Sequence, residues 1–291
     1  MQLLDRRTFL ALTAGTAAAG LAAPARAGLS GAEIFTADPF GGVVDSTVIL
    51  GEDSAVLIDA QFTLPNATQL ADVIAATGKR LETILITHVH PDHHLGLAVI
   101  MDRFPEARPV AHPSIQPLIE GAAQGLLDYM KAGQPDNFPD RVVIPEALEG
   151  DAILLEGERI EVLDPMHGDT DLISAVHIPA LDTLVASDFA YTGTHAWVAE
   201  NTTPEKIDMW RASLAKLEAI GAGTVVPGHR STDAMNDASA FAATRAYLDQ
   251  WQAALASTST AEELKAAMMD GNEGLGLGFA LDRAVGAVYP G

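Results

Sequence analysis

A dense group of imidazole side chains directly follows an apolar segment of this chain. Residues 81–87 are rich in β-branched and apolar side chains, which predicts a buried strand. Residues 88–94 then hold four of the nine histidines. His88 and His90 are two positions apart, so in extended backbone both imidazoles point to the same side and can bind one cation. The chain therefore has to fold so that a buried strand ends at a metal site.

A second cation fits beside the first. Pro91 turns the chain, and Asp92 and His93 follow at a place where another ion can lie about 4 Å from the first. The chain has no cysteine, so any metal ligand has to be histidine or a carboxylate. This donor set suits zinc and, less selectively, iron, manganese or cobalt.

The remaining pattern predicts strands followed by helices, twice along the chain. Two such halves, packed sheet against sheet with helices outside, predict an α/β (α+β) fold, a four-layer αββα sandwich. The segment 131–150 is rich in Pro, Asp and Gly and is interpreted as a long surface loop, and the Gly-rich tail from residue 271 as irregular. Strands are expected over 46–50, 54–60, 81–87, 108–111, 152–155, 159–163, 174–178, 183–187 and 224–227, and helices over 66–77, 95–104, 114–130, 204–220, 233–256 and 261–269.

Residues 1–27 have the features of an export signal. The pair Arg6-Arg7 precedes an apolar stretch of about 15 residues, which is shorter than a membrane span and ends at a small-residue cleavage site, Ala25 to Ala27. This form resembles a twin-arginine (Tat) signal, which implies a protein that the Tat machinery exports folded to the periplasm or outside the cell. Residues 28–291 are then expected to form one domain.

The charge of the chain excludes some partners. The net charge is −22 at pH 7, and removing the signal, with three arginines and one aspartate, brings it to −24. Such a surface repels phosphate backbones and anionic lipids, so we expect neither nucleic acid nor a stable membrane association. A small-molecule substrate is the expected partner, and the oligomeric state is left open.

The motif His88-x-His90-x-Asp92-His93 after an apolar strand resembles the signature of the metallo-β-lactamase superfamily of zinc hydrolases. The resemblance runs over about residues 46–230 and implies two zinc ions. It also implies that Asp59, in the strand expected over 54–60, steadies the metal-binding loop. The implied ligands are His88, His90 and His167 for one ion, Asp92, His93 and His229 for the other, and Asp188 as a bridge between both.

The position of His167 departs from the family pattern. The family usually has His-Thr-x-Gly there, whereas this chain has His-Gly-Asp-Thr-Asp over residues 167–171. His177 is the competing candidate, but it lies in the middle of an apolar strand, where a core or cross-strand role is more natural. We expect His94 to lie at the rim of the site or behind the ligands, and His112 to be structural.

The resemblance also implies a mechanism. A hydroxide shared by two metals and hydrogen-bonded to Asp92 would attack a carbonyl or phosphoryl centre. Tyr191 stands three residues after Asp188, as in the zinc lactonases of the superfamily, where a tyrosine donates a hydrogen bond to the substrate carbonyl oxygen. His195 and Trp197 are candidates for the pocket mouth. Asp92 and Tyr191 are thus the expected catalytic residues of a hydrolase of small esters or lactones.

Two other functions remain open. A periplasmic metallo-β-lactamase fits the motif and the export signal, although true β-lactamases generally lack the bridging aspartate that Asp188 supplies. A metal-dependent oxidoreductase, such as a one-iron sulfur dioxygenase, or a non-catalytic metal binder could use the same fold. The diiron reductases of the superfamily tend to carry Glu where His90 stands, and a sulfur dioxygenase would not need all seven ligands.

Overall fold

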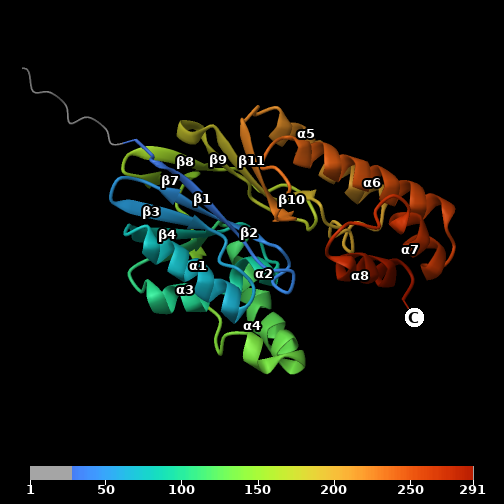
Figure 1. Ribbon diagram of the computed structural model, residues 1–291, viewed down its shortest axis with the longest axis horizontal. Coiled ribbons are helices and arrows are strands. Elements are labelled where there is room, and N and C mark those ends of the chain that lie inside the picture. The colour runs from blue at the N-terminus through green and yellow to red at the C-terminus, as the bar shows by residue number, and fades with distance from the viewer. Residues whose placement is uncertain (1–27, 291) are drawn as a thin grey trace, which may run out of the picture.

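Two β-sheets lie face to face in this protein, and helices cover the outer face of each (Figure 1). The structure, a computed structural model, describes residues 28–290, so the expected export signal over residues 1–27 lies outside the described residues. The four layers confirm the αββα sandwich expected from the sequence.

The first sheet has six strands in the order β1-β2-β3-β4-β5-β6. The strands β1, β2 and β3 are antiparallel neighbours, whereas β3, β4, β5 and β6 run parallel. Parallel strands end at the same edge of a sheet, so the loops after β3 and β4 lie close together. The strands are β1 (Gly31–Thr36), β2 (Asp45–Leu50), β3 (Ser54–Ile58), β4 (Arg80–Ile86), β5 (Arg108–Ala111) and β6 (Glu146–Ala147).

The second sheet has five strands in the order β11-β10-β9-β8-β7, and only the β10–β11 pair is parallel. The pairing of β10 with β11 is irregular around Ser187, which has a positive φ of 49°. Such bulges re-aim side chains and are frequent next to active sites. The strands are β7 (Ala152–Leu155), β8 (Glu158–Val162), β9 (Val176–Ile178), β10 (Thr183–Thr192) and β11 (Thr224–Arg230).

The side-chain alternation of the strands builds three separate apolar cores. On β3, Ala55 and Leu57 pack against the outer helices, whereas Val56 and Ile58 face the second sheet. The strand β10 alternates in the same way on the other side of the interface. Because both faces of these strands are buried, apolar residues follow one another directly in Ala55 to Ile58 and in Leu184 to Ala186.

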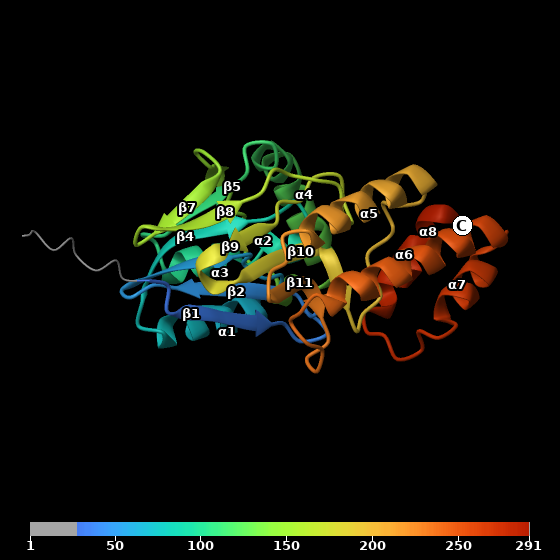
Figure 2. The same ribbon diagram turned by 90° about the horizontal axis from the view of Figure 1, so that it is seen from above.

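The helices fall into two sets. The first set covers the first sheet, and the second set covers the other sheet and extends beyond it, where Figure 2 shows α6, α7 and α8 gathered at one end of the molecule. No helix within residues 28–290 is both long and apolar enough to span a bilayer. The sets are α1 (Leu64–Ala76), α2 (Pro91–His94), α3 (Leu97–Arg103) and α4 (Gln116–Gly133), then α5 (Pro204–Glu218), α6 (Ser239–Ser257), α7 (Ala261–Met269) and α8 (Gly278–Val288).

Local sequence explains where some helices begin. The side chain of Thr203 caps α5 by accepting a hydrogen bond from the Lys206 amide, and Pro204 occupies the first turn, where its missing N–H costs nothing. Buried residues of α5 then recur at helical spacing, as in Trp210, Leu214 and Leu217.

Two expectations about the elements were wrong, and one strand was missed. The tail after residue 271 is not all irregular, because α8 buries Leu281, Ala284 and Val285 against the helices beside it. The strand β1 was not expected at all. The segment 131–150 is not purely a surface loop, since Phe138 is buried, with its ring 4.9 Å from that of Phe62, and β6 pairs with β5.

Gly96 marks a close approach that the first half of the fold depends on. A Cβ there would lie 2.2 Å from the Ala60 carbonyl oxygen and 2.7 Å from the Ala67 Cβ. We predict that Gly96→Ala lowers the free energy of unfolding by about 1–3 kcal/mol, because backbone would have to move. Thermal and urea unfolding of the purified protein measure this change.

Gly125→Ala is the matched control. Gly125 is exposed within α4, and a Cβ there meets nothing within 4 Å, so alanine should stabilise the protein by about 0.5–1 kcal/mol. Equal effects of the two substitutions would contradict the close approach at Gly96.

Candidate metal centre

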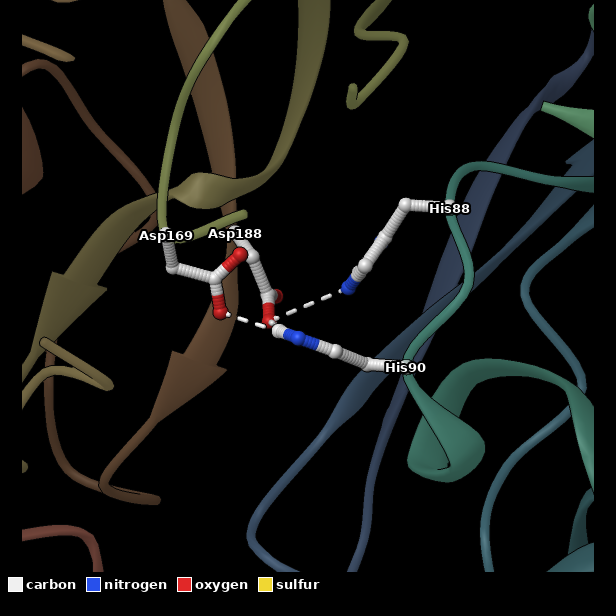
Figure 3. Close-up of side chains that lie close together, drawn as sticks. All are labelled: His88, His90, Asp169 and Asp188. Carbon is white, nitrogen blue, oxygen red and sulfur yellow. Dashed lines mark ion pairs between the residues drawn. The ribbon is translucent and has the colours of Figure 1, made fainter. Parts of the chain in front are cut away.

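Polar side chains from both sheets meet at one edge of the sandwich. His88 and His90 lie in the loop after β4, opposite Asp169 and Asp188 from the other half of the chain (Figure 3). Within each of two groups, one ligand atom per residue lies within 4.8 Å of the others. The groups are His88, His90, Asp169 and Asp188, and Asp92, His93 and His229.

The first group is held at ion-pair distances. The Nε2 atom of His88 lies 3.4 Å from Asp188 Oδ2, and His90 Nδ1 lies 3.2 Å from Asp169 Oδ2 and 3.9 Å from Asp188 Oδ2 (Figure 3). His88, Asp169 and Asp188 are at most 1% exposed. With His90, whose side chain is 15% exposed, they form a set of two imidazoles and two carboxylates.

Asp188 also contacts the second group. Its Oδ1 atom lies 3.1 Å from His93 Nε2, and its Oδ2 atom lies 3.3 Å from His229 Nε2. The same His229 nitrogen is 3.4 Å from Asp92 Oδ2. The carboxylate of Asp188 therefore joins the two groups, which is the arrangement expected of a bridging ligand.

Each imidazole of the centre uses one ring nitrogen for a protein partner and leaves the other for the centre. The protein partners lie 2.7–3.0 Å from the outer ring nitrogens. They are Thr87 Oγ1 for His88, Glu200 Oε1 for His90, Asp59 Oδ2 for His93 and the Gly42 carbonyl oxygen for His229. Histidines that bind metals are usually oriented in this way, because the outer hydrogen bond fixes both tautomer and ring direction.

Several inward atoms lack hydrogen-bond partners within the protein. Buried atoms without a partner include Nε2 of His88, Nε2 of His93, Oδ1 of Asp169 and Oδ1 of Asp188. The 3.1 Å approach of His93 to Asp188 is close but not aligned as a hydrogen bond. Buried polar atoms are almost always paired, and imidazole with carboxylate is a donor set for divalent ions, so these residues fit a metal.

Burial and the neighbouring carboxylates act in opposite directions on the pKa values of the histidines in the centre. Burial lowers the pKa of His229, but Asp188 and Asp92 outweigh it and raise that pKa to about 9. Burial raises the pKa of Asp169 to about 7, and burial lowers that of His88 to about 4. Protons on some imidazoles thus balance the carboxylates, and a bound dication would displace those protons.

Asp59 holds the histidine loop, as the resemblance implied. Its carboxylate accepts hydrogen bonds from the Thr87 amide, the Thr87 hydroxyl and His93 Nδ1, all at 2.8 Å. Asp59 is 1% exposed and adopts φ = 60°, a left-handed conformation that aspartate tolerates better than most residues. The Thr87 hydroxyl also lies 2.8 Å from Ser187 Oγ, so this bond network links the two sheets.

Tyr191 lies inside the centre rather than at its mouth. Its hydroxyl is 2.7 Å from Asp169 Oδ2 and 3.0 Å from Asp188 Oδ2, and its ring stacks on His229 at a centroid distance of 4.9 Å. The residue is only 3% exposed. In this structure the hydroxyl orients the carboxylates, and the expected hydrogen bond to a substrate carbonyl stays a prediction.

His167 is not a member of either ligand group among the described residues, so the ligand role that the resemblance implied for it stays a prediction. Its Nε2 atom donates to Asn201 Oδ1 at 2.7 Å. Its buried Nδ1 atom lies 3.3 Å from Asp171 Oδ1 but has no hydrogen-bond partner. Asp169, two residues further on, takes the place in the first group. The departure from the family pattern at residues 167–171 was the sequence signal for this difference.

The other histidines of the chain are accounted for by local contacts. His177 pairs across strands with Glu161 at 3.1 Å, as expected. The buried His94 donates to the Val89 carbonyl oxygen, which places it behind the ligands, and His112 accepts from the Ser114 amide.

The pocket-mouth candidates differ from each other. His195 is buried, and its Nδ1 atom lies 3.0 Å from the Tyr247 hydroxyl, so it does not line an open mouth. Trp197 is half-buried with its ring 6.0 Å from that of His90. Sequence reasoning missed Glu200, which contacts both His90 and the Trp197 indole N–H.

Comparison with known proteins places this centre in a family. The family model described as the metallo-beta-lactamase superfamily matches residues 39–229, a range that contains both ligand groups. Among the curated proteins, none matches the chain.

Solved structures share the fold. A metallo-beta-lactamase family protein from Thermus thermophilus superposes with a TM-score of 0.61 at 20% identity, covering 88% of this chain and 91% of that one. A beta-lactamase domain protein from Burkholderia ambifaria gives 0.62 at 18% identity, with 88% and 85% covered. A metallo-beta-lactamase from Pontibacter korlensis gives 0.52 at 22% identity, with 76% and 95% covered.

These identities show a common fold and not a common substrate. The family model, in contrast, covers well over half of the chain and runs from the loop before β2 to the last histidine of the centre. The chain belongs to the metallo-beta-lactamase superfamily.

Proposed function

We propose that this protein is a hydrolase of small esters or lactones that depends on two divalent metal ions, with zinc as the expected ion. The observation that carries the proposal is the position of Asp188, whose one carboxylate contacts His88 on one side and His93 and His229 on the other. A buried carboxylate between two groups of imidazoles suits a pair of ions better than a single ion.

The residues of the centre have distinct tasks in this proposal. Zinc, when bound, supplies water activation at neutral pH and polarises a carbonyl oxygen. Asp92 has a side chain 21% exposed, whereas Asp169 and Asp188 are buried, so Asp92 is the carboxylate that a water molecule can reach. It is placed to accept a hydrogen bond from that water. Asp59 keeps His93 oriented so that its Nε2 atom serves the centre.

A small neutral substrate is favoured by the charge around the centre. The Glu200 carboxylate, with a side chain 40% exposed, lies beside His90, and the chain as a whole is strongly acidic. The cationic side chains near the centre are already paired, Arg230 with Asp45 and Lys206 with Asp171. The spacing from Asp188 to Tyr191 supports the lactonase side of the proposal.

A substrate screen with metal removal tests the function. Residues 28–291, reconstituted with zinc, are assayed against a γ-lactone, an aryl ester, a β-lactam, a thioester and a phosphotriester, with metal counted by elemental analysis. We expect turnover of the lactone or ester, loss of turnover after chelation, and recovery with zinc.

The screen also separates the alternatives. Strong β-lactam turnover with inert lactones and esters would favour a metallo-β-lactamase. Oxygen uptake with a persulfide by the iron-loaded protein, without any hydrolysis, would favour an oxidoreductase.

Substitution of the bridging residue tests the two-metal arrangement. Asp188→Asn keeps the shape of the side chain but removes its charge, so we expect the loss of about one metal ion per chain and a fall in kcat on the order of a hundredfold. Asp164→Asn is the control, because its carboxylate is fully exposed. Two retained ions with near-normal turnover in Asp188→Asn would show that this carboxylate does not bridge.

We also propose that the chain is exported folded through its twin-arginine segment. The support is the sequence around Arg6 and Arg7, which lies outside the described residues. We predict that replacing both arginines by lysine leaves the uncleaved protein in the cytoplasm, because the Tat machinery reads the arginine pair. Cell fractionation measures this, and normal appearance of the variant in the periplasm would refute the proposal.

A further inference from the structure

We propose that Asp169, rather than a histidine, completes the first half of the metal centre, and that this carboxylate shifts the centre towards harder ions such as Mn²⁺. This inference rests on the metal dependence in the proposed function and concerns which ion the centre prefers. It starts from the position of Asp169, which is fully buried and lies 3.2 Å from His90 Nδ1 through Oδ2, while its Oδ1 atom has no hydrogen-bond partner.

The loop that carries Asp169 is fixed by contacts with Asn201. The side-chain amide of Asn201 donates to the Gly168 and Asp169 carbonyl oxygens at 3.2 and 2.8 Å, and its Oδ1 atom accepts from His167 Nε2. Gly168 allows this path, since a Cβ there would lie 2.7 Å from Ile173 Cδ1. The imidazole of His167 is thus held at Nε2 by Asn201, and its buried Nδ1 atom has no hydrogen-bond partner. The side chain that joins His88, His90 and Asp188 in one ligand group is Asp169.

A second carboxylate fixes the histidine that Asp169 contacts. Glu200 Oε1 lies 2.9 Å from His90 Nε2, and Glu200 Oε2 accepts from the Thr170 hydroxyl at 2.7 Å. The neighbours Glu200 and Asn201 therefore hold both partners, His90 and the loop of Asp169, in one arrangement. Both halves of the contact are positioned before any ion arrives.

The consequence is a change in donor type. The resemblance implied five imidazoles and two carboxylates, whereas the two groups contain four imidazoles and three carboxylates. Carboxylate oxygen suits Mn²⁺ and Mg²⁺ better than imidazole does, whereas imidazole favours zinc. Zinc remains the tighter ion in any such site, but the margin by which zinc exceeds manganese becomes smaller. The third carboxylate also brings the charge of seven ligands to −3, which leaves one positive charge with two dications.

Metal binding to the apo protein tests whether Asp169 is a ligand and whether it shifts the metal preference, without any assay of activity. The apo forms of wild type, Asp169→Asn, His167→Ala and Asp171→Asn are titrated with Zn²⁺ and, separately, Mn²⁺, and affinities are measured by competition with a chromophoric chelator. Asp169→Asn keeps an oxygen acceptor for the Tyr191 hydroxyl, so the fold should persist, and thermal unfolding of each apo variant checks this.

We expect Asp169→Asn to weaken binding at one site by at least about tenfold, since even outer partners of metal ligands change affinity by 10–100-fold. The loss should be larger for Mn²⁺ than for Zn²⁺. His167→Ala and the matched loop control Asp171→Asn should bind both ions as wild type does.

Each contrary result has its own meaning. If His167→Ala, folded in its apo form, loses a site while Asp169→Asn does not, the ligand assignment is overturned and the proposed function survives. Equal losses of both ions in Asp169→Asn would overturn the metal preference alone. A wild-type protein that binds neither ion would overturn the proposed function together with this inference.

Discussion

Unsolvated negative charge at the meeting point of the two sheets is the constraint on which this structure depends. Asp59, Asp169 and Asp188 are each at most 1% exposed. Isolated buried charges cost several kcal/mol each, so such carboxylates persist only with cationic partners and a full set of hydrogen bonds. Here the partners are imidazoles, and the inward atoms of the centre that remain without hydrogen bonds belong to the two ligand groups, where divalent ions would lie. Burying these carboxylates costs free energy, and the same carboxylates are ligands that would bind divalent ions.

The fold brings these residues together through parallel strands that end at the same edge of each sheet. The parallel pairs β3–β4 and β10–β11 deliver Asp59, the histidine loop, Asp188 and His229 to one edge of the sandwich. The contact between Thr87 and Ser187 connects the two sheets directly beneath the centre. The apolar side chains of these strands fix their register, because a one-residue slip would turn every side chain to the other face.

Sequence reasoning succeeded where the chemistry is local. The spacing of His88 and His90 after a buried strand predicted two imidazoles on one side, and Asp188 was expected to join both halves, where its contacts do place it. It did not anticipate Asp169, because the loop that carries this residue is held by Asn201, 32 positions away. It also missed α8, because the apolar face of this helix is buried only by packing against neighbouring helices that are distant in the sequence.

The amino-acid sequence by itself determined the layer order of the fold, the donor types of the centre and the family to which the chain belongs. Near-continuous apolar runs specify strands buried on both faces, and the absence of cysteine leaves only nitrogen and oxygen ligands. The tertiary structure alone decided that Asp169 lies in the centre and that Glu200 holds His90. These choices rest on contacts between distant segments, and no local pattern encodes the direction in which a loop presents its side chains.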